Sequence, residues 1–142
     1  MSKKAFKFFD HTADILYEGY GSTYPEALEN AAAALFETIA DLKKVKSIKS
    51  VKIREWAPNR DELAVRVLSD LVAQRDALGL FFKTFSVTKI EEKDGGYALE
   101  GVAKGSSMTP EAGLLDVKAV THHETKAFEN KGRWTVRVLL DI

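Results

Sequence analysis

The chain contains no cysteine, no excess of either charge and no long hydrophobic run. Without cysteine, disulfides and thiolate metal sites are excluded, and an intracellular setting is permitted. The 21 basic and 21 acidic residues cancel, which argues against a protein that binds nucleic acid through bulk positive charge but does not exclude a small basic patch. No apolar run is long enough for a signal peptide or a membrane span, so we expect a soluble, cytoplasmic protein.

The sequence also lacks a Gly-rich phosphate loop, a nucleophile elbow and the histidine spacing of a zinc site. Generic motifs therefore assign no catalytic class. The 142 residues are 45% apolar and 30% charged, which is typical of a soluble globular protein. We predict a single domain over residues 1–142, large enough to bury one core.

Two segments carry apolar residues at helical spacing. The first covers residues 24–41 and follows a capping box that begins at Thr23. The second covers residues 60–78, with Asn59 as the N-cap and Gly79 as the C-terminal stop. Both patterns predict amphipathic helices whose apolar faces lie on a sheet.

The remaining regular segments alternate or favour extended structure. Gly19 and Gly21 bracket the end of the extended segment over residues 14–20. Turns at residues 94–96 and 130–132 form two hairpins. The fold class is α+β, with two helices packed on a mixed or antiparallel β-sheet in the order β-α-β-α-β-β-β-β. Strands are predicted at residues 6–9, 14–20, 50–56, 81–93, 97–103, 117–128 and 133–141.

Two connections stand out between these elements. Residues 43–49 are rich in lysine, and we interpret them as a solvated loop rather than a basic patch. Residues 105–116 form a Gly/Ser/Pro-containing loop of about twelve residues, a length that suggests a function.

Chemistry-bearing residues gather at the two ends of the chain. The run Asp10 to Asp14 (DHTAD) places two carboxylates and His11 within five residues, and Asp141 precedes the terminal carboxyl of Ile142. Carboxylate oxygens at strand ends suit a hard divalent cation, so we predict that both ends meet to hold one. Alternatively, Asp10 and Asp14 form Asx turns, and His11 is a hydrogen-bonded structural residue.

The only other histidines are His122 and His123. Adjacent residues of a regular strand point to opposite faces, so the two side chains cannot serve one site there. In that strand Lys118 shares its face with His122. A lysine near carboxylates can bind a phosphate, although a solvated lysine is the commoner case.

Three separated motifs resemble the archease family: DHTADI at Asp10–Ile15, VKAVTHHE at Val117–Glu124 and VRVLLDI at Val136–Ile142. The likeness covers essentially the whole chain. Archeases are protein cofactors of RtcB-type RNA ligases, which join RNA ends through a guanylylated histidine with GTP and manganese. The resemblance implies an archease-like fold and an accessory protein without catalysis of its own, which promotes guanylylation and multiple turnover in tRNA splicing and RNA repair.

The resemblance also implies partners and residue roles. The partner is the ligase, GTP and RNA are reached only through it, and no membrane is involved. The cofactor is a divalent metal ion, with calcium first and magnesium or manganese as alternatives. The roles are the metal ligands Asp14, Asp141 and Ile142, the activation-essential Asp14, Lys118 and His123, and the supporting Asp10 and His11.

Two other functions remain open. One is a stand-alone metal-dependent phosphohydrolase with His11 or His123 as the base. The other is a non-enzymatic, chaperone-like interaction module in which the carboxylates brace the termini. The chain also departs from the family pattern in the second helix over residues 64–77, at His122, where tyrosine is usual, and in the loop over residues 106–115.

Overall fold

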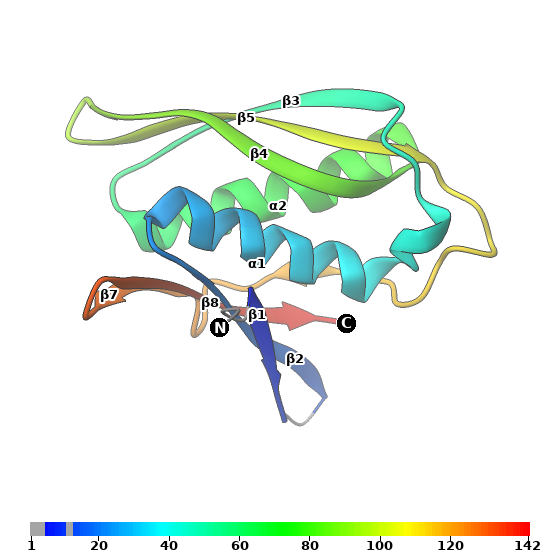
Figure 1. Ribbon diagram of the computed structural model, residues 1–142, viewed down its shortest axis with the longest axis horizontal. Coiled ribbons are helices and arrows are strands. Elements are labelled where there is room, and N and C mark those ends of the chain that lie inside the picture. The colour runs from blue at the N-terminus through cyan, green and yellow to red at the C-terminus, as the bar shows by residue number, and fades with distance from the viewer. Residues whose placement is uncertain (1–4, 11–12) are drawn as a thin grey trace.

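The computed structural model describes residues 5–10 and 13–142, which form three layers (Figure 1). The two long helices make the middle layer, and an antiparallel sheet covers each side of it. In chain order the elements are β1 (Phe6–Phe9), β2 (Asp14–Gly21), α1 (Tyr24–Ile39), the 3-10 helix η1 (Leu42–Lys44), β3 (Lys49–Ala57), α2 (Arg60–Leu78), β4 (Leu80–Lys93), β5 (Gly96–Ser107), β6 (Ala119–Val120), β7 (Lys126–Asn130) and β8 (Arg133–Asp141).

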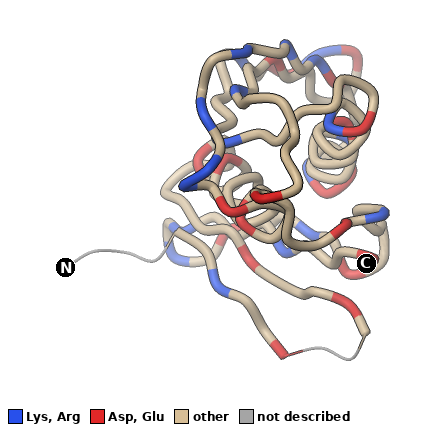
Figure 2. Tube along the Cα trace, turned by 90° about the vertical axis from the view of Figure 1, so that its right-hand side faces the viewer, with Lys and Arg blue, Asp and Glu red and all other residues tan. Residues whose placement is uncertain are grey.

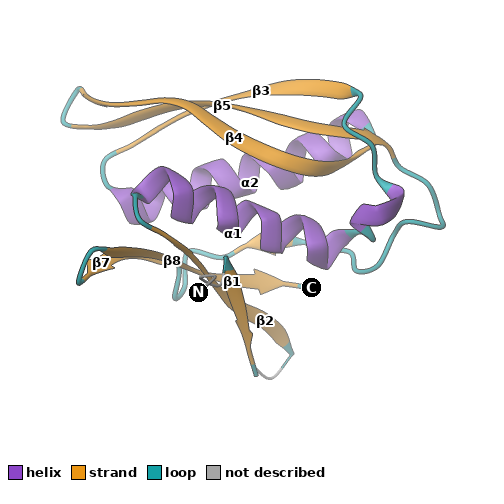
Figure 3. Cartoon of the chain, in the orientation of Figure 1, coloured by secondary structure: helices purple, strands orange, loops and turns teal. Residues whose placement is uncertain are grey.

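The two sheets have different strand orders. One runs β1-β2-β8-β6, with β7 also paired to β8, and the other runs β3-β5-β4. All these pairings are antiparallel. Figure 3 shows the helices between the two sets of strands. The predicted α+β class with two helices is confirmed. The predicted order has one strand before the first helix and four after the second, on one sheet, whereas the structure has two and five, in two sheets with the helices between them.

Helix α1 has two buried sides, which explains the second sheet. Toward β4, the rings of Phe36 and Phe82 lie 5.8 Å apart. Toward β2, the buried alanines Ala27 and Ala31 let the strand approach the helix backbone at Gly19. A helix with large apolar side chains on one side and alanines on the other can be covered by a sheet on both.

The predicted starts of both helices and the predicted end of α2 are confirmed, whereas α1 ends at Ile39 and not at residue 41. The Thr23 hydroxyl accepts from the Glu26 N–H at 3.2 Å, and the side-chain Oδ1 of Asn59 accepts from the Glu62 N–H at 2.8 Å. Gly79 ends α2 in the left-handed conformation, with φ of 63°. Within the described part of the chain, no helix has the length and apolar character needed to cross a membrane.

The single strand predicted over residues 117–128 is wrong. Two short strands, β6 and β7, pair with opposite ends of β8, and a turn over residues 121–125 separates them. In this turn the Thr125 hydroxyl donates to the Thr121 carbonyl at 2.6 Å, and Glu124 has φ of 65°. Threonine hydroxyls that bond to nearby carbonyls compete with the sheet ladder. His122 and His123 therefore lie in a turn, and the prediction that Lys118 shares a strand face with His122 is also wrong.

Candidate functional site

The two ends of the chain lie side by side where β2 begins and β8 ends. Asp14 opens β2, Asp141 closes β8, and the two residues are directly opposed in the register. Directly opposed residues project on the same face of a sheet, with Cβ atoms ~5 Å apart. Lys118 lies next to them, because its backbone N–H donates to the Asp141 carbonyl at 2.8 Å. We call these three residues the paired-end site.

Of the other predicted members, two lie on the segments that adjoin this site. Ile142 is the last residue and is 37% exposed, and Asp10 lies exposed after β1. His11 lies outside the described residues. Ala13 has φ of 68°, a left-handed conformation that costs a non-glycine residue about 1–2 kcal/mol. The connection into β2 therefore holds a strained residue immediately before the paired-end site.

The potential metal ligands at the paired-end site are all oxygen atoms. Asp14 is half-buried and Asp141 is exposed, and like charges directly opposed on a sheet repel each other. Within residues 5–10 and 13–142, no group of three or more His, Cys, Asp or Glu side chains is arranged to hold a metal. An ion here would depend on two carboxylates, the terminal carboxylate, backbone oxygens and water. That donor set fits calcium, magnesium or manganese rather than a soft metal.

His123 lies on a different segment from the paired-end site. The Thr121 N–H donates to the Leu139 carbonyl at 3.0 Å, after which the chain enters the turn. His123 is exposed in that turn, and its carbonyl accepts from the Thr121 hydroxyl at 2.8 Å. The structure thus places Lys118, but not His123, directly beside the carboxylate pair.

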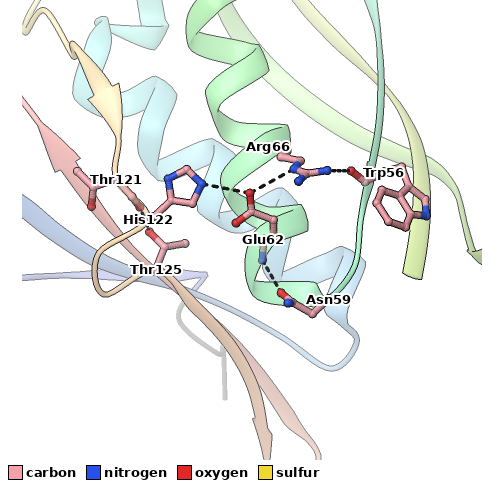
Figure 4. Close-up of polar contacts among 7 residues, drawn as sticks. All are labelled: Trp56, Asn59, Glu62, Arg66, Thr121, His122 and Thr125. Atoms are coloured by element: carbon pink, nitrogen blue, oxygen red, sulfur yellow. Dashed lines mark hydrogen bonds and ion pairs between the residues drawn. The ribbon is translucent and has the colours of Figure 1, made fainter. Parts of the chain in front are cut away.

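A polar cluster at the start of α2 escaped the sequence analysis (Figure 4). Glu62 Oε1 accepts from Arg66 Nε at 3.2 Å and lies 3.1 Å from His122 Nε2. Arg66 Nη1 donates to the Trp56 carbonyl at 2.6 Å. The spacing of Glu62 and Arg66 is a signal for a helical pair, but His122 comes from a distant segment. The cluster ties the 121–125 turn to α2 and β3.

The pKa values of two carboxyls near Arg66 shift in opposite directions. Burial raises the pKa of Glu62, but hydrogen bonds from His122 and Arg66 and their positive charges outweigh it and bring the pKa below its usual value. For Glu55, burial is the largest cause of a raised pKa, and the hydrogen bond and negative charge of Asp70 raise it further. The positive charge of Arg66 lowers the pKa, but the net result is a rise to about 7.

An apolar groove of about 360 Å³ lies between the end of α2 and the loop over residues 108–118. Met108, Leu114 and Leu115 line it and are 37%, 60% and 45% exposed. Arg75, which is buried, fixes the end of this loop, since its Nη2 donates to the Val117 carbonyl at 2.9 Å. The next residue is Lys118, so the loop that lines the groove continues along the chain into the paired-end site. A second hollow, of about 410 Å³, is lined by Pro58 and residues 92–97 and contains none of the predicted site residues.

The chain is similar to known proteins over almost its full length. The sequence model of the archease protein family matches residues 6–142. The protein archease of Pyrococcus furiosus is 37% identical over 142 residues, covering 98% of this chain and 99% of that protein. The solution structure of a Methanobacterium thermoautotrophicum protein has a TM-score of 0.84 at 33% identity, with 97% and 99% of the two chains covered. The crystal structure of a Thermotoga maritima archease, described as a possible chaperone, has a TM-score of 0.56 at 21% identity, with 100% and 98% covered, and supports the fold alone.

Proposed function

Because the chain belongs to the archease family, we propose that it is an accessory protein that activates an RtcB-type RNA ligase in tRNA splicing and RNA repair. It promotes guanylylation of the ligase and multiple turnover, and it performs no catalysis itself. The observation that carries the proposal is the direct opposition of Asp14 and Asp141, with Lys118 bonded beside them. These are positions at which the sequence resembles the family's functional residues.

The residues of the paired-end site have distinct tasks in this proposal. Asp14, Asp141 and a backbone or terminal oxygen of Ile142 would hold a divalent cation, with calcium preferred. Such a cation would supply positive charge for a phosphate oxygen. Lys118, held next to Asp141 by its backbone, adds a second cation for a phosphate. The protein thereby orders the phosphates of GTP in the ligase.

The apolar groove supports a protein as the partner. Exposed apolar side chains that gather in one groove mark interaction sites more often than solvated surface. Met108, Leu114 and Leu115 gather in this way, and residues 116–118 lead from them to the paired-end site. We expect the ligase to contact the groove while the paired-end site reaches its nucleotide. The Thermotoga maritima archease is described as a possible chaperone, which is likewise an action on another protein.

A multiple-turnover ligation assay tests the proposal. An RtcB-type ligase, GTP and manganese are incubated with the RNA, with and without this protein. We expect stimulation by the wild type and a loss of at least about tenfold, or about 1.4 kcal/mol, in Asp14→Asn and in Asp141→Asn. Asp94→Asn is the matched control, because Asp94 is exposed in the β4–β5 turn and asparagine tolerates its positive φ. Full stimulation by Asp14→Asn contradicts the proposed site.

The same samples separate the two other candidate functions. A stand-alone phosphohydrolase cleaves a phosphodiester substrate when it is incubated without the ligase. A chaperone-like module, which the exposed groove also favours, prevents ligase aggregation equally well as wild type and as Asp14→Asn. Stimulation that depends on both aspartates and needs the ligase supports activation over both.

A further inference from the structure

One end of the β3-β5-β4 sheet carries a concentration of lysines that the proposed function leaves unused. Residues 43–52 contain five lysines and no acidic residue. Lys44 and Lys83 donate to the backbone carbonyls of Glu111 and Val45. The remaining exposed lysines of this region form what we call the lysine strip, which consists of Lys43, Lys46, Lys49, Lys52 and Lys104.

Hydrogen bonds anchor the loop part of the lysine strip to a strand. The Lys46 N–H donates to the Ser106 hydroxyl at 3.0 Å, and the Ile48 N–H donates to the Gly105 carbonyl at 3.1 Å. These bonds hold the segment before β3 against β5. Lys104 is directly opposed to Ser50, two residues from Lys52.

Lys52 and Lys104 of the strip point toward solvent. Ile53 of β3 and Ala103 of β5 are fully buried toward the helices. Side chains alternate along a strand, so Lys52 and Lys104 lie on the outer face of the sheet. Residues 43–49 are predicted as a solvated loop, and their lysines are exposed. Lys52 and Lys104 add two exposed lysines on the neighbouring strands β3 and β5.

The positive charge of the strip is not neutralised by the protein itself. In residues 5–10 and 13–142, none of the five lysines forms an ion pair, whereas Arg54, Arg66, Arg75 and Arg137 each pair with a carboxylate. Outside the strip the chain has 16 basic residues and all 21 of its acidic residues, so the remainder of the chain is net negative. The charge of a neutral chain is therefore unevenly placed. In Figure 2 blue segments line the upper left, while red segments flank the β1–β2 connection at the bottom.

From this placement we propose that the lysine strip binds the phosphate backbone of RNA without sequence preference. Lysine ammonium groups are hydrated point charges that suit phosphates. Protein interfaces instead favour aromatic residues and arginine and are depleted in lysine. The strip contains only lysines, with Ser50 between two of them. The phosphate chemistry follows from the strip alone, and the choice of RNA rests on the proposed function, in which the partner ligase joins RNA.

Binding is measured by fluorescence anisotropy with the full chain, no ligase, and a labelled single-stranded RNA of about 20 nucleotides. We expect weak binding near 50 mM salt, with log K falling against log salt with a slope of about −2 to −3.5 for three to five contacts. Lys46→Gln/Lys52→Gln/Lys104→Gln should weaken the slope by about 2 and lower the affinity by about tenfold or more. A DNA strand of the same sequence should bind similarly, because backbone phosphates carry the contact.

The matched control is Lys93→Gln/Lys126→Gln/Lys131→Gln, which removes three exposed lysines that also form no ion pair within the described part of the chain. It should bind as the wild type does. Thermal melts of both triple variants should match the wild type. Absence of wild-type binding at 50 mM salt, or equal losses in the two variants, would overturn the proposal. Equally effective competition by polyglutamate would overturn the assignment to phosphates. Since no ligase is present, these outcomes are independent of the ligation assay.

Discussion

Asp14 and Asp141 carry like charges at directly opposed positions of β2 and β8. A sheet gains nothing from such a pair, since opposed like charges repel and cost some tenths of a kcal/mol up to about 1 kcal/mol. A divalent cation coordinated by both carboxylates would offset this repulsion, and the change can be measured through stability.

Asp141→Asn should consequently stabilise the metal-free protein and remove its response to metal. In a chelator we expect the free energy of unfolding to rise by about 0.5 kcal/mol. With calcium at about 100 times its Kd, the wild type should gain about 2.7 kcal/mol, and Asp141→Asn should gain far less. The measurement is thermal unfolding in chelator and in calcium, magnesium or manganese, with Asp94→Asn as the control. Identical wild-type melting in all four conditions would rule out metal binding at the paired-end site.

At the scale of elements, the contact between β2 and α1 depends on a missing side chain. A Cβ added at Gly19 would lie 2.5 Å from the Ala31 N and 2.7 Å from the Ala27 carbonyl oxygen. Both atoms belong to the helix backbone, which cannot move without shifting the whole helix. Tyr17, on the same strand, is fully buried and donates its hydroxyl to the Ala31 carbonyl at 2.8 Å. This close contact positions β2, and with it Asp14.

Gly19→Ala should therefore destabilise the fold, by about 1–3 kcal/mol as for other overpacked sites. Urea unfolding measures the change. Gly113→Ala is the matched control, because the nearest atom to its added Cβ, Phe81 Cζ, is 3.5 Å away, an ordinary contact. If both substitutions cost the same, the close approach at Gly19 does not limit the packing of β2 on α1.

Features that depend on nearby residues can be predicted from the sequence, whereas contacts between distant segments cannot. Thr23 and Asn59 are recognisable as caps because each bonds an N–H only three residues away. Gly19 and Gly21 are read as strand-end signals, although the reason for Gly19 is a helix that packs on it. The bond between His122 and Glu62 spans 60 positions, so local patterns carry no sign of it.

The site follows the same division between local and distant information. Asp14 and Asp141 lie at the ends of strands that the sequence marks clearly, so their meeting can be predicted once β2 and β8 pair. The position of His123 cannot, because hydroxyl bonds of Thr121 and Thr125 replace the ladder in the middle of the predicted strand. The spacing of apolar residues in the two helices likewise does not indicate that a second sheet covers them.

At the scale of the whole molecule, the three-layer arrangement gives different surfaces to different sheets. The paired-end site belongs to the β2–β8 sheet, the lysine strip to the β3–β5 sheet, and the apolar groove to the loop that joins β5 to β6. A ligase that contacts the groove thus meets the carboxylate pair through residues 116–118. The outer face of the other sheet stays free for RNA. Protein binding and activation can therefore be separated by mutation.

Leu114→Asn/Leu115→Asn should weaken binding to the ligase by about tenfold or more, because truncating buried apolar anchors at an interface costs upward of about 1 kcal/mol each. Asp14→Asn should retain binding while it loses stimulation. Isothermal titration calorimetry with the ligase gives both Kd values without RNA. The control is Ile48→Asn/Phe128→Asn, since Ile48 and Phe128 are 71% and 42% exposed but lie outside the groove. Unchanged affinity in the Leu114/Leu115 variant would show that the ligase binds elsewhere, whereas loss of binding in Asp14→Asn would make the paired-end site itself the principal contact.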